Sequence, residues 1–242
     1  MTAWIAMGRS GAQVTACAMK GVTLLRTAQG VDEAAALSHL DYTADRILRI
    51  GDGAPAKLPA PVLPNGGRGL PGFTQDNPPD VIGGWVRLWI IGFLAQHENW
   101  DGVICACEGD VTHWIHISAR EAVSCQSFLT QRLVTALGGT LPPDDAAIDD
   151  SLSRPERLAA HLRIAEVTGN TAAVTGHLIG AELAAARAYW LGQQVALIAA
   201  DRDASGYGAA LNAQGVPLTS FTPEALMPAA LAALGKEFGL TG

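Results

Sequence analysis

The chain has 242 residues, 49% of them hydrophobic, with a mean hydropathy of +0.20 and a net charge of −7. A chain of this size and composition can bury a sizeable core, which excludes intrinsic disorder. Its most apolar stretch, residues 85–95, is too short to span a bilayer and carries Arg87, and 16 Lys and Arg in an acidic chain argue against a nucleic-acid partner.

The first half of the chain is predicted to begin with an antiparallel meander. Three β-compatible segments separated by glycine-containing turns form it: residues 4–7, 13–19 and 22–27. A helix over 31–40 and a strand over 46–50 follow. Residues 51–84 hold 8 glycines and 7 of the 13 prolines, which predicts a long crossing without a helix or central strand. A buried helix over 85–96 is expected next.

The second half is predicted to repeat this order in outline. Strands over 102–107 and 112–117 form another hairpin, and a helix is expected over 124–137. Ser153 and Glu156 have the spacing of a capping box at the start of a further helix. The remaining predicted elements alternate: a helix over 171–191, a strand over 194–200, a helix over 205–214, a strand over 216–220 and a last helix opened by Thr222-Pro-Glu. This order predicts two α/β lobes, residues 1–100 and 101–242, each a mixed sheet flanked by helices.

The predicted helix over 171–191 carries two pairs of note. Gly176 and Gly180 are four apart and small enough for close packing against another backbone. His177 and Glu182 are five apart, so they do not share a face, and no acid–base pair is expected. Glu182 with Arg187 is expected on a solvated face or as a cap to the sheet.

The cysteines and the amino terminus indicate the compartment. Four cysteines stand in apolar segments: Cys17, Cys105, Cys107 and Cys125. The chain is too large to need disulfides, so buried thiols are expected. Cys105 and Cys107 with His113 and His116 superficially suggest zinc, but side chains three apart on a straight strand point to opposite faces, which favours core thiols. The first residues lack a basic region followed by a long apolar run, so the cytoplasm is the expected location.

Several segments spread over the chain carry a resemblance to one family. They are Trp4-Ile-Ala, Gln75-Asp-Asn-Pro-Pro-Asp-Val81, Gly109 with Trp114-Ile115, Thr140-Leu-Pro-Pro143, Gly176-His-Leu-Ile-Gly-Ala-Glu-Leu183 and Tyr207-Gly-Ala-Ala-Leu-Asn-Ala-Gln-Gly215. Together with the two hairpins, they resemble the 2-dehydro-3-deoxygalactonokinases (2-keto-3-deoxygalactonokinases), sugar kinases with a two-lobed actin/Hsp70-like (ribonuclease H-like) fold. Membership implies ATP- and Mg²⁺-dependent phosphorylation of the terminal hydroxyl of a six-carbon keto-deoxy sugar acid in the cleft between the lobes, in galactonate catabolism.

The resemblance also implies site residues. Glycine-bearing turns at 8–11 and 109–112 would offer backbone amides to the phosphates of ATP. The expected nucleotide-binding residues are Gly8, Ser10, Gly11, Gly109 and Thr112, with Gly206 on the adenosine side. Asp110 would face phosphate and metal, and Asp80 would orient the sugar acid. Each has a structural alternative: a turn aspartate for Asp110, an Asx turn or cap for Asp80 and ordinary helix packing for Gly206.

Three departures from the family pattern concern the catalytic groups. The first family strand ends in an acid that organises Mg²⁺, whereas this chain has Gly8. After Asp80-Val81 the family has an Arg-Gly-Glu-Glu run, which is replaced here by Ile82-Gly-Gly-Trp-Val86. The second phosphate loop, residues 109–113, differs from the family in either of two alignments. No metal ligand is therefore assigned.

Two functions are compatible with this sequence. The first is an ATP-dependent keto-deoxy sugar-acid kinase, although each lost donor or carboxylate would cost about 10²- to 10³-fold in rate. The second is a catalytically degenerate relative that binds sugar acid or nucleotide in a regulatory or partner role. In both, the partner is a small-molecule sugar acid and neither nucleic acid nor membrane. The oligomeric state is open, a homodimer being one option.

Overall fold

The computed structural model describes residues 2–67 and 69–241, with the backbone alone for residues 201–205. The chain forms two compact α/β units. Unit 1 contains the residues through Trp100, Ser118–Ser124 and the residues from Pro223 onward, and unit 2 contains Asp101–Ile117 and Cys125–Thr222. The last helix of the chain therefore belongs to unit 1. The expected lobes, divided at residue 100, place this helix in the second lobe.

Unit 1 begins with the expected meander. Its five-stranded sheet has the order β3 (Thr23–Gly30), β2 (Gln13–Lys20), β1 (Ala3–Ser10), β4 (Ile47–Ile50) and β7 (Gly69–Leu70). The first three strands are antiparallel, and β4 runs parallel to β1. Helix α1 (Glu33–Leu40) begins after Asp32, whose side chain accepts a hydrogen bond from the Ala35 amide at 2.8 Å. Ala36 and Leu40 of this helix pack on the buried face of the sheet.

The glycine- and proline-rich segment of unit 1 is ordered and contains only short strands. They are β5 (Ala56–Lys57), β6 (Ala60–Pro61), β7, β8 (Phe73–Asp76) and β9 (Pro79–Ile82). Strands β5, β8 and β9 form a three-stranded sheet. The proline content limits each strand because proline cannot donate to a ladder. The described part of the segment contains no helix before α2 begins at Gly84, as predicted, but β8 pairs with β5 on one side and β9 on the other, so the expectation of no central strand is wrong.

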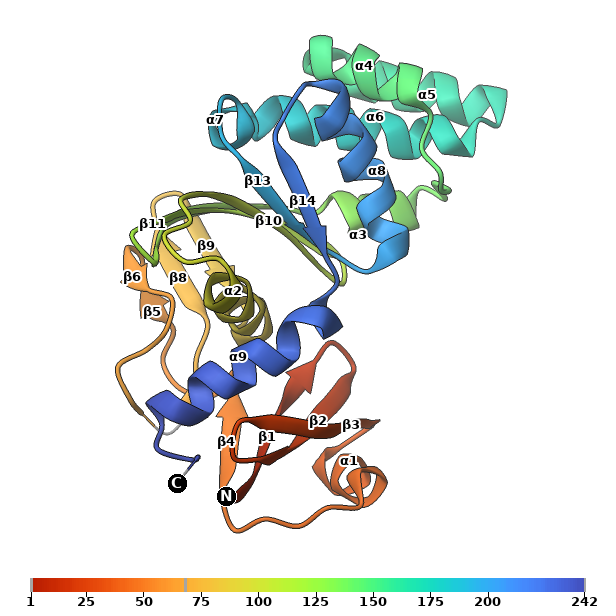
Figure 1. Ribbon diagram of the computed structural model, residues 1–242. Helices are drawn as coiled ribbons and strands as arrows, with labels where there is room; N and C mark the ends of the chain where they lie inside the picture. Colours follow the sequence, from red (N-terminus) through yellow and green to blue (C-terminus); the bar gives the residue numbers. More distant parts are fainter. Residues whose placement is uncertain (1, 68, 242) are drawn as a thin grey trace. The chain divides into compact units, whose positions relative to one another are not determined.

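Two helices complete unit 1. Helix α2 (Gly84–Gln96) is buried at every position from Gly84 to Leu94, as the apolar sequence predicts. It lies beside α9 (Pro223–Glu237), the last helix (Figure 1). Gly92 permits this approach, because a Cβ atom there would stand 2.3 Å from the carbonyl oxygen of Leu226.

Unit 2 is built on a mixed sheet with the order β14 (Leu218–Phe221), β13 (Val195–Ile198), β10 (Gly102–Glu108), β11 (Val111–Ser118) and β12 (Glu121–Phe128). Strands β10 and β11 form the expected antiparallel hairpin, while β13 is parallel to both β10 and β14. The expected helix over 124–137 is wrong in its first part. The chain stays in strand β12 to Phe128, and α3 (Thr130–Ala136) begins only afterwards.

The helices of unit 2 correct a second prediction. They are α3, α4 (Asp145–Ser153), α5 (Leu158–Thr168), α6 (Thr171–Ala185), α7 (Arg187–Trp190) and α8 (Asp201–Ala213), with a 3-10 turn at Pro155–Arg157. Ser153 ends α4 instead of opening a helix, so the capping box is wrong. Helix α5 follows Arg157 and has no side-chain cap, whereas α4 is capped by Asp144, which accepts from the Ala147 amide at 3.2 Å.

Helices α4, α5 and α6 pack together within unit 2 (Figure 1). Gly176 and Gly180 allow the close α4–α6 approach that their spacing predicts, since added Cβ atoms would stand 2.4 Å from the Asp144 oxygen and 2.2 Å from the Ile148 oxygen. The four cysteines are buried thiols, as expected. Within the described residues, no helix is both long and apolar enough to pass through a membrane.

Candidate functional site

The first predicted phosphate turn joins β1 to β2 in unit 1. Ser10 pairs with Gln13 across it, and Gly11 has a φ of +60°, where glycine is favoured. The Arg9 guanidinium donates to the Ala12 carbonyl at 3.3 Å, so it closes the turn. The Trp85 indole N–H donates to the Arg9 carbonyl at 2.7 Å. The turn is thereby tied to the first turn of helix α2.

The backbone around Gly8, where the resemblance implies a metal-organising acid, leaves no room for a side chain. A Cβ atom at Gly8 would stand 2.1 Å from the carbonyl oxygen of Ile50 in β4. Overpacking of this kind is destabilising. The backbone of the neighbouring strand occupies the space that a carboxylate would need.

Asp80 lies in β9, opposite Gln75 of β8. Its Oδ1 atom accepts from the Val81 amide at 2.8 Å, and its carbonyl accepts from the Thr74 hydroxyl at 3.3 Å. One carboxylate oxygen is thus engaged by the adjacent backbone. The two family glutamates that follow are replaced by Trp85 and Val86, which are buried in α2.

The second predicted phosphate turn joins β10 to β11 in unit 2. Gly109 has a φ of +57°, and no heavy atom would crowd a Cβ there. The Asp110 Oδ2 atom lies 3.4 Å from Nε of Arg132, and the Asp110 carbonyl accepts from the Arg132 amide at 3.3 Å. Asp110 therefore ties this turn to helix α3.

Thr112 belongs to a buried hydrogen-bond network that sequence reasoning did not find. Its hydroxyl is 3.0 Å from the Tyr207 hydroxyl, which donates to Oε2 of Glu182 at 2.7 Å. The Trp114 indole N–H donates to Oε1 of Glu182 at 2.8 Å, and Thr130 also bonds this carboxyl group. Strand β11, α3, α6 and α8 therefore meet at one carboxyl group. Any contact of Thr112 with phosphate would have to come from its backbone, because its side chain faces the core.

Burial governs the ionisation of Glu182. Glu182 is 3% exposed, so the prediction of a solvated position is wrong. Its contact with the sheet is made inside the core. Burial raises the pKa of Glu182 to about 7, against the lowering effect of the bonds from Thr130, Trp114 and Tyr207. The sequence signal was the surrounding helix, which is apolar on all sides and leaves no solvent-facing stripe.

Gly206 lies at the start of α8, next to Tyr207. It is buried, and a Cβ atom there would stand 2.7 Å from Cδ1 of Ile179 and 3.3 Å from Cγ of Pro143. The described neighbours of Gly206 are thus side chains of unit 2, which corresponds to the helix-packing alternative.

A second buried polar group joins α4, α5 and α6. The Ser151 hydroxyl lies 3.0 Å from Nδ1 of His161 and 2.9 Å from Nδ1 of His177, so it can donate to one ring and accept from the other. Nε2 of His161 faces Oδ2 of Asp150 at 3.2 Å. Burial lowers the pKa of His177, and the neighbouring His161 lowers it further. Because the serine is fully buried, this group stabilises helix packing and offers no accessible nucleophile.

The residues at the expected positions do not fit a metal ion held by the protein alone. In the part of the chain that the structure describes, no three His, Cys, Asp or Glu side chains come together as ligands. Sites for Mg²⁺ in phosphoryl transfer use one or two carboxylates with substrate phosphates. Here Gly8 excludes one carboxylate, and Asp110 is paired with Arg132.

A comparison with known protein families finds a match for residues 152–234, a segment that includes Glu182 and Tyr207. This segment matches the family model of 2-keto-3-deoxy-galactonokinase. The match covers about a third of the chain. The segment that carries the match spans α5 to most of α9, and it contains two members of the buried network. No curated protein matches the chain.

Several solved structures have a similar fold. A Sinorhizobium meliloti protein provisionally assigned as a 2-dehydro-3-deoxygalactonokinase has a TM-score of 0.81 at 17% identity, covering 98% of both chains. Component A of the Acidaminococcus fermentans (R)-2-hydroxyglutaryl-CoA dehydratase has a TM-score of 0.51 at 11% identity, covering 97% of this chain and 96% of that one. The activator of the Clostridium difficile 2-hydroxyisocaproyl-CoA dehydratase, with bound ADPNP, has a TM-score of 0.54 at 6% identity, covering 98% and 96%. The chain shares the α/β fold of these proteins, as the sequence predicts.

Proposed function

We propose that the chain is a kinase that transfers the γ-phosphoryl group of ATP to a hydroxyl group of a keto-deoxy sugar acid, with 2-dehydro-3-deoxygalactonate as the substrate. The observation that carries the proposal is the family-model match over residues 152–234. The full-length similarity to the Sinorhizobium meliloti protein supports it. The cytoplasm, where ATP is available, is the proposed location.

In the proposed reaction, the sugar hydroxyl oxygen attacks the γ-phosphorus, the bond to the β-phosphate oxygen breaks, and ADP leaves. Mg²⁺ enters as part of the MgATP substrate, and no step is assigned to a metal held by the protein. Backbone amides of the turns at Gly11 and Gly109 are the proposed phosphate contacts, with Gly8 and Ser10 supporting the first turn. The buried bonds of Thr112 and Tyr207 would hold the strand and the helix that flank the second turn.

The proton of the attacking hydroxyl needs an acceptor. Asp80 and Asp110 are the proposed candidates, because each carboxylate belongs to a partly or fully exposed residue and can be reached by a ligand. General-base assistance is typically worth about 10²- to 10⁴-fold in rate. Changing the residue that serves as the base to asparagine should therefore lower kcat at least about 100-fold.

The test is incubation of the purified chain with ATP, Mg²⁺ and 2-dehydro-3-deoxygalactonate, with ADP and the phosphorylated acid measured by mass spectrometry. Asp80→Asn and Asp110→Asn are compared with Asp76→Asn and Asp149→Asn, matched changes in the same two units. We expect turnover in the wild type and in both controls. No turnover at high enzyme concentration, together with a melting shift induced by nucleotide or sugar acid, would instead identify a catalytically degenerate relative.

A further inference from the structure

Unit 1 contains a cavity that the roles assigned above do not use. Its volume is about 510 Å³, and it lies among the loops that carry β5, β6 and β7 and beside α2. The walls are small or apolar: alanines, prolines and glycines of residues 53–71. Arg87 of α2 also lines the cavity. It is the only basic side chain among the described residues that line the cavity.

Arg87 is held by neutral groups alone. Its side chain is 2% exposed. Nε donates to the Val62 carbonyl at 2.8 Å, Nη1 to the Pro71 carbonyl at 3.0 Å and Nη2 to the Pro61 carbonyl at 2.9 Å. The guanidinium carbon lies 4.4 Å from the centroid of the Phe73 ring. Among the described residues, no carboxylate forms an ion pair with Arg87.

A buried guanidinium with no anionic partner leaves a positive charge uncompensated. Arginine remains protonated in proteins, so the charge cannot be removed by neutralisation. Burial lowers the pKa of Arg87 to about 10, which still leaves the group charged at neutral pH. Charged groups are rarely buried unless they are paired. An anion in the cavity would provide the missing partner, and Coulomb attraction there is stronger than in water.

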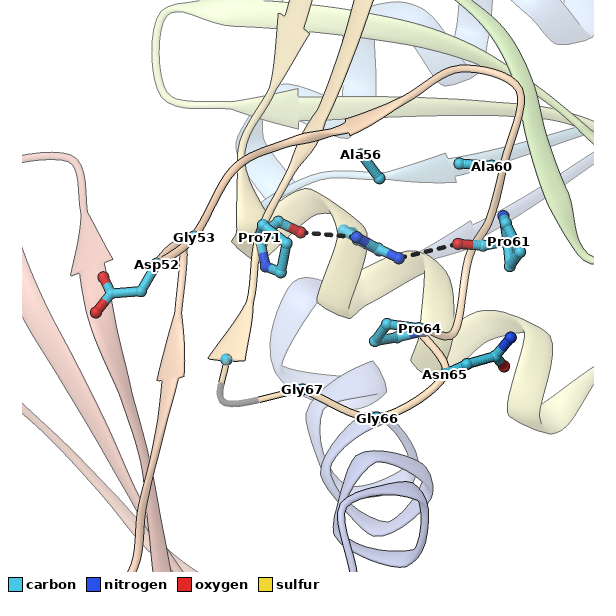
Figure 2. Close-up of a pocket in the computed structure, with 12 residues that line it drawn as sticks. Asp52, Gly53, Ala56, Ala60, Pro61, Pro64, Asn65, Gly66, Gly67 and Pro71 are labelled. Carbon is cyan, nitrogen blue, oxygen red and sulfur yellow. Dashed lines mark hydrogen bonds between the residues drawn. The ribbon is translucent and has the colours of Figure 1, made fainter.

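The donor geometry favours a planar anion. Guanidinium has five N–H groups, of which three are used by the carbonyls of Val62, Pro71 and Pro61. One N–H therefore remains on each terminal nitrogen. Figure 2 shows the carbonyls of Pro71 and Pro61 on opposite sides of the guanidinium. Two remaining donors on one fork match the two oxygens of a carboxylate.

The other polar side chains at the cavity do not compete for this role. Asp52 and Asn65 line it, but in Figure 2 their polar ends point away from Arg87. Three carbonyl groups and the Phe73 ring contact the guanidinium, and Ala56 and Ala60 form part of the wall. This surface suits an aliphatic carbon next to a carboxylate.

We propose that this cavity binds the carboxylate end of the sugar acid, with Arg87 as the residue that selects an acid over a neutral sugar. The assignment of the ligand as a 2-keto-3-deoxy sugar acid rests on the proposed function, whereas the anion site rests on Arg87 and its surroundings. The 2-keto carboxylate would contact the two remaining N–H groups, and the deoxy carbon would face Ala56 and Pro71. Arg87 is a specificity residue here and takes no part in phosphoryl transfer.

The probe is pyruvate, which has the carboxylate and 2-keto groups of the sugar acid and a methyl group in place of its deoxy carbon. Pyruvamide is its neutral counterpart. Both are titrated at constant ionic strength to about 50 mM, because fragments of this size bind in the millimolar range. Binding is followed by NMR of the ¹⁵N-labelled full chain, including the Nε–H signal of Arg87. We expect saturable shifts with pyruvate at Arg87 and at the amides of Gly53 and Gly67, and none with pyruvamide.

Two variants separate binding from folding. Ala56→Leu fills the cavity and leaves Arg87 in place, and Arg87→Lys keeps the charge without the planar fork. We expect about 10- to 100-fold weaker pyruvate binding in both, as for loss of hydrogen bonds to a charged group. Arg26→Lys, the same change at a more exposed arginine of unit 1, should bind as the wild type does. The folded NMR spectrum of Ala56→Leu checks that this variant keeps its structure.

Equal shifts with pyruvate and pyruvamide, no saturable shift with pyruvate, or unchanged pyruvate binding in Ala56→Leu would overturn the proposal. The kinase assay on the same samples distinguishes it from the proposed function. If pyruvate binds at Arg87 but the wild type phosphorylates no sugar acid, the kinase function fails and the carboxylate site stands. If the wild type phosphorylates the sugar acid and Ala56→Leu leaves its KM unchanged, the carboxylate site fails and the kinase function stands.

Discussion

Replacing Glu182 with glutamine should remove a pH dependence from the stability of this protein. Glutamine can keep the network, because its oxygen can accept from the Trp114 indole at the present 2.8 Å geometry and its amide can donate to the Tyr207 hydroxyl. The Tyr207 hydroxyl would then donate to Thr112, an orientation that their 3.0 Å contact permits. The substitution removes the titrating proton and keeps partners for Trp114, Tyr207 and Thr112.

The magnitude follows from the raised pKa of Glu182, which is about 7 in the folded chain against 4.5 for the ordinary group. Between these values the unfolded chain releases a proton that the folded chain keeps, so the free energy of unfolding falls as pH rises. The loss is at most about 1.4 kcal/mol per pH unit and totals about 3 kcal/mol above pH 7. The stabilisation is fully present below pH 4.5 and is lost as pH rises through 7.

The assay is urea unfolding of the wild type and of Glu182→Gln at pH values from 4.5 to 8. From pH 4.5 to 8, we expect the unfolding free energy of the wild type to fall by about 3 kcal/mol relative to that of the variant. His177, with its lowered pKa, loses stabilisation as pH falls, but it does so in both proteins and cancels in the difference. Glu166→Gln, at an exposed carboxylate paired with Arg163, is the matched control and should follow the wild type. A difference that stays constant with pH would show that the bonds from Trp114 and Tyr207 keep Glu182 ionised throughout, and would refute the reasoning.

Two further substitutions test the first hairpin turn. Gly8→Ala should lower the free energy of unfolding by about 1–3 kcal/mol because its methyl group would meet the Ile50 carbonyl. Gly208→Ala is the control and should cause no loss, because its methyl group would meet only side-chain carbons at 3.9 Å and its φ is not positive. Denaturant unfolding measures both, and equal losses would contradict the steric account of the missing acid. Trp85→Phe should cost about 1 kcal/mol and speed amide hydrogen exchange in the turn, since it removes the 2.7 Å bond to the Arg9 carbonyl. Unchanged exchange at the turn would show that this bond does not hold it.

Local sequence patterns were sufficient where an element depends on its own residues. The meander in residues 4–27 follows from alternating strands and glycine turns, and the burial of α2 follows from its uniformly apolar sequence. Proline after Thr222 correctly marks the start of α9. Strand β12 was missed because its residues are compatible with a helix, and pairing within the sheet decides in favour of the strand.

The site was less predictable than the fold. The turns at Gly11 and Gly109 were expected, and both have the positive φ that suits glycine. The roles proposed for Asp80, Asp110 and Gly206 remain predictions. The buried position of Glu182 could have been inferred from an ionisable residue in a helix without a polar face, but its bonds to Trp114 and Tyr207 join residues 68 and 25 positions apart.

The amino-acid sequence by itself determined the α/β class, the family resemblance and the two glycine turns, because these depend on short-range spacing and on residue type. Only the tertiary structure decided that Ile50 excludes a side chain at Gly8, that Glu182 is shared among four elements and that Arg87 donates to three carbonyl groups. Each of these is a contact between segments distant in the chain. Such contacts are set by how strands and helices pack, and no local pattern specifies them.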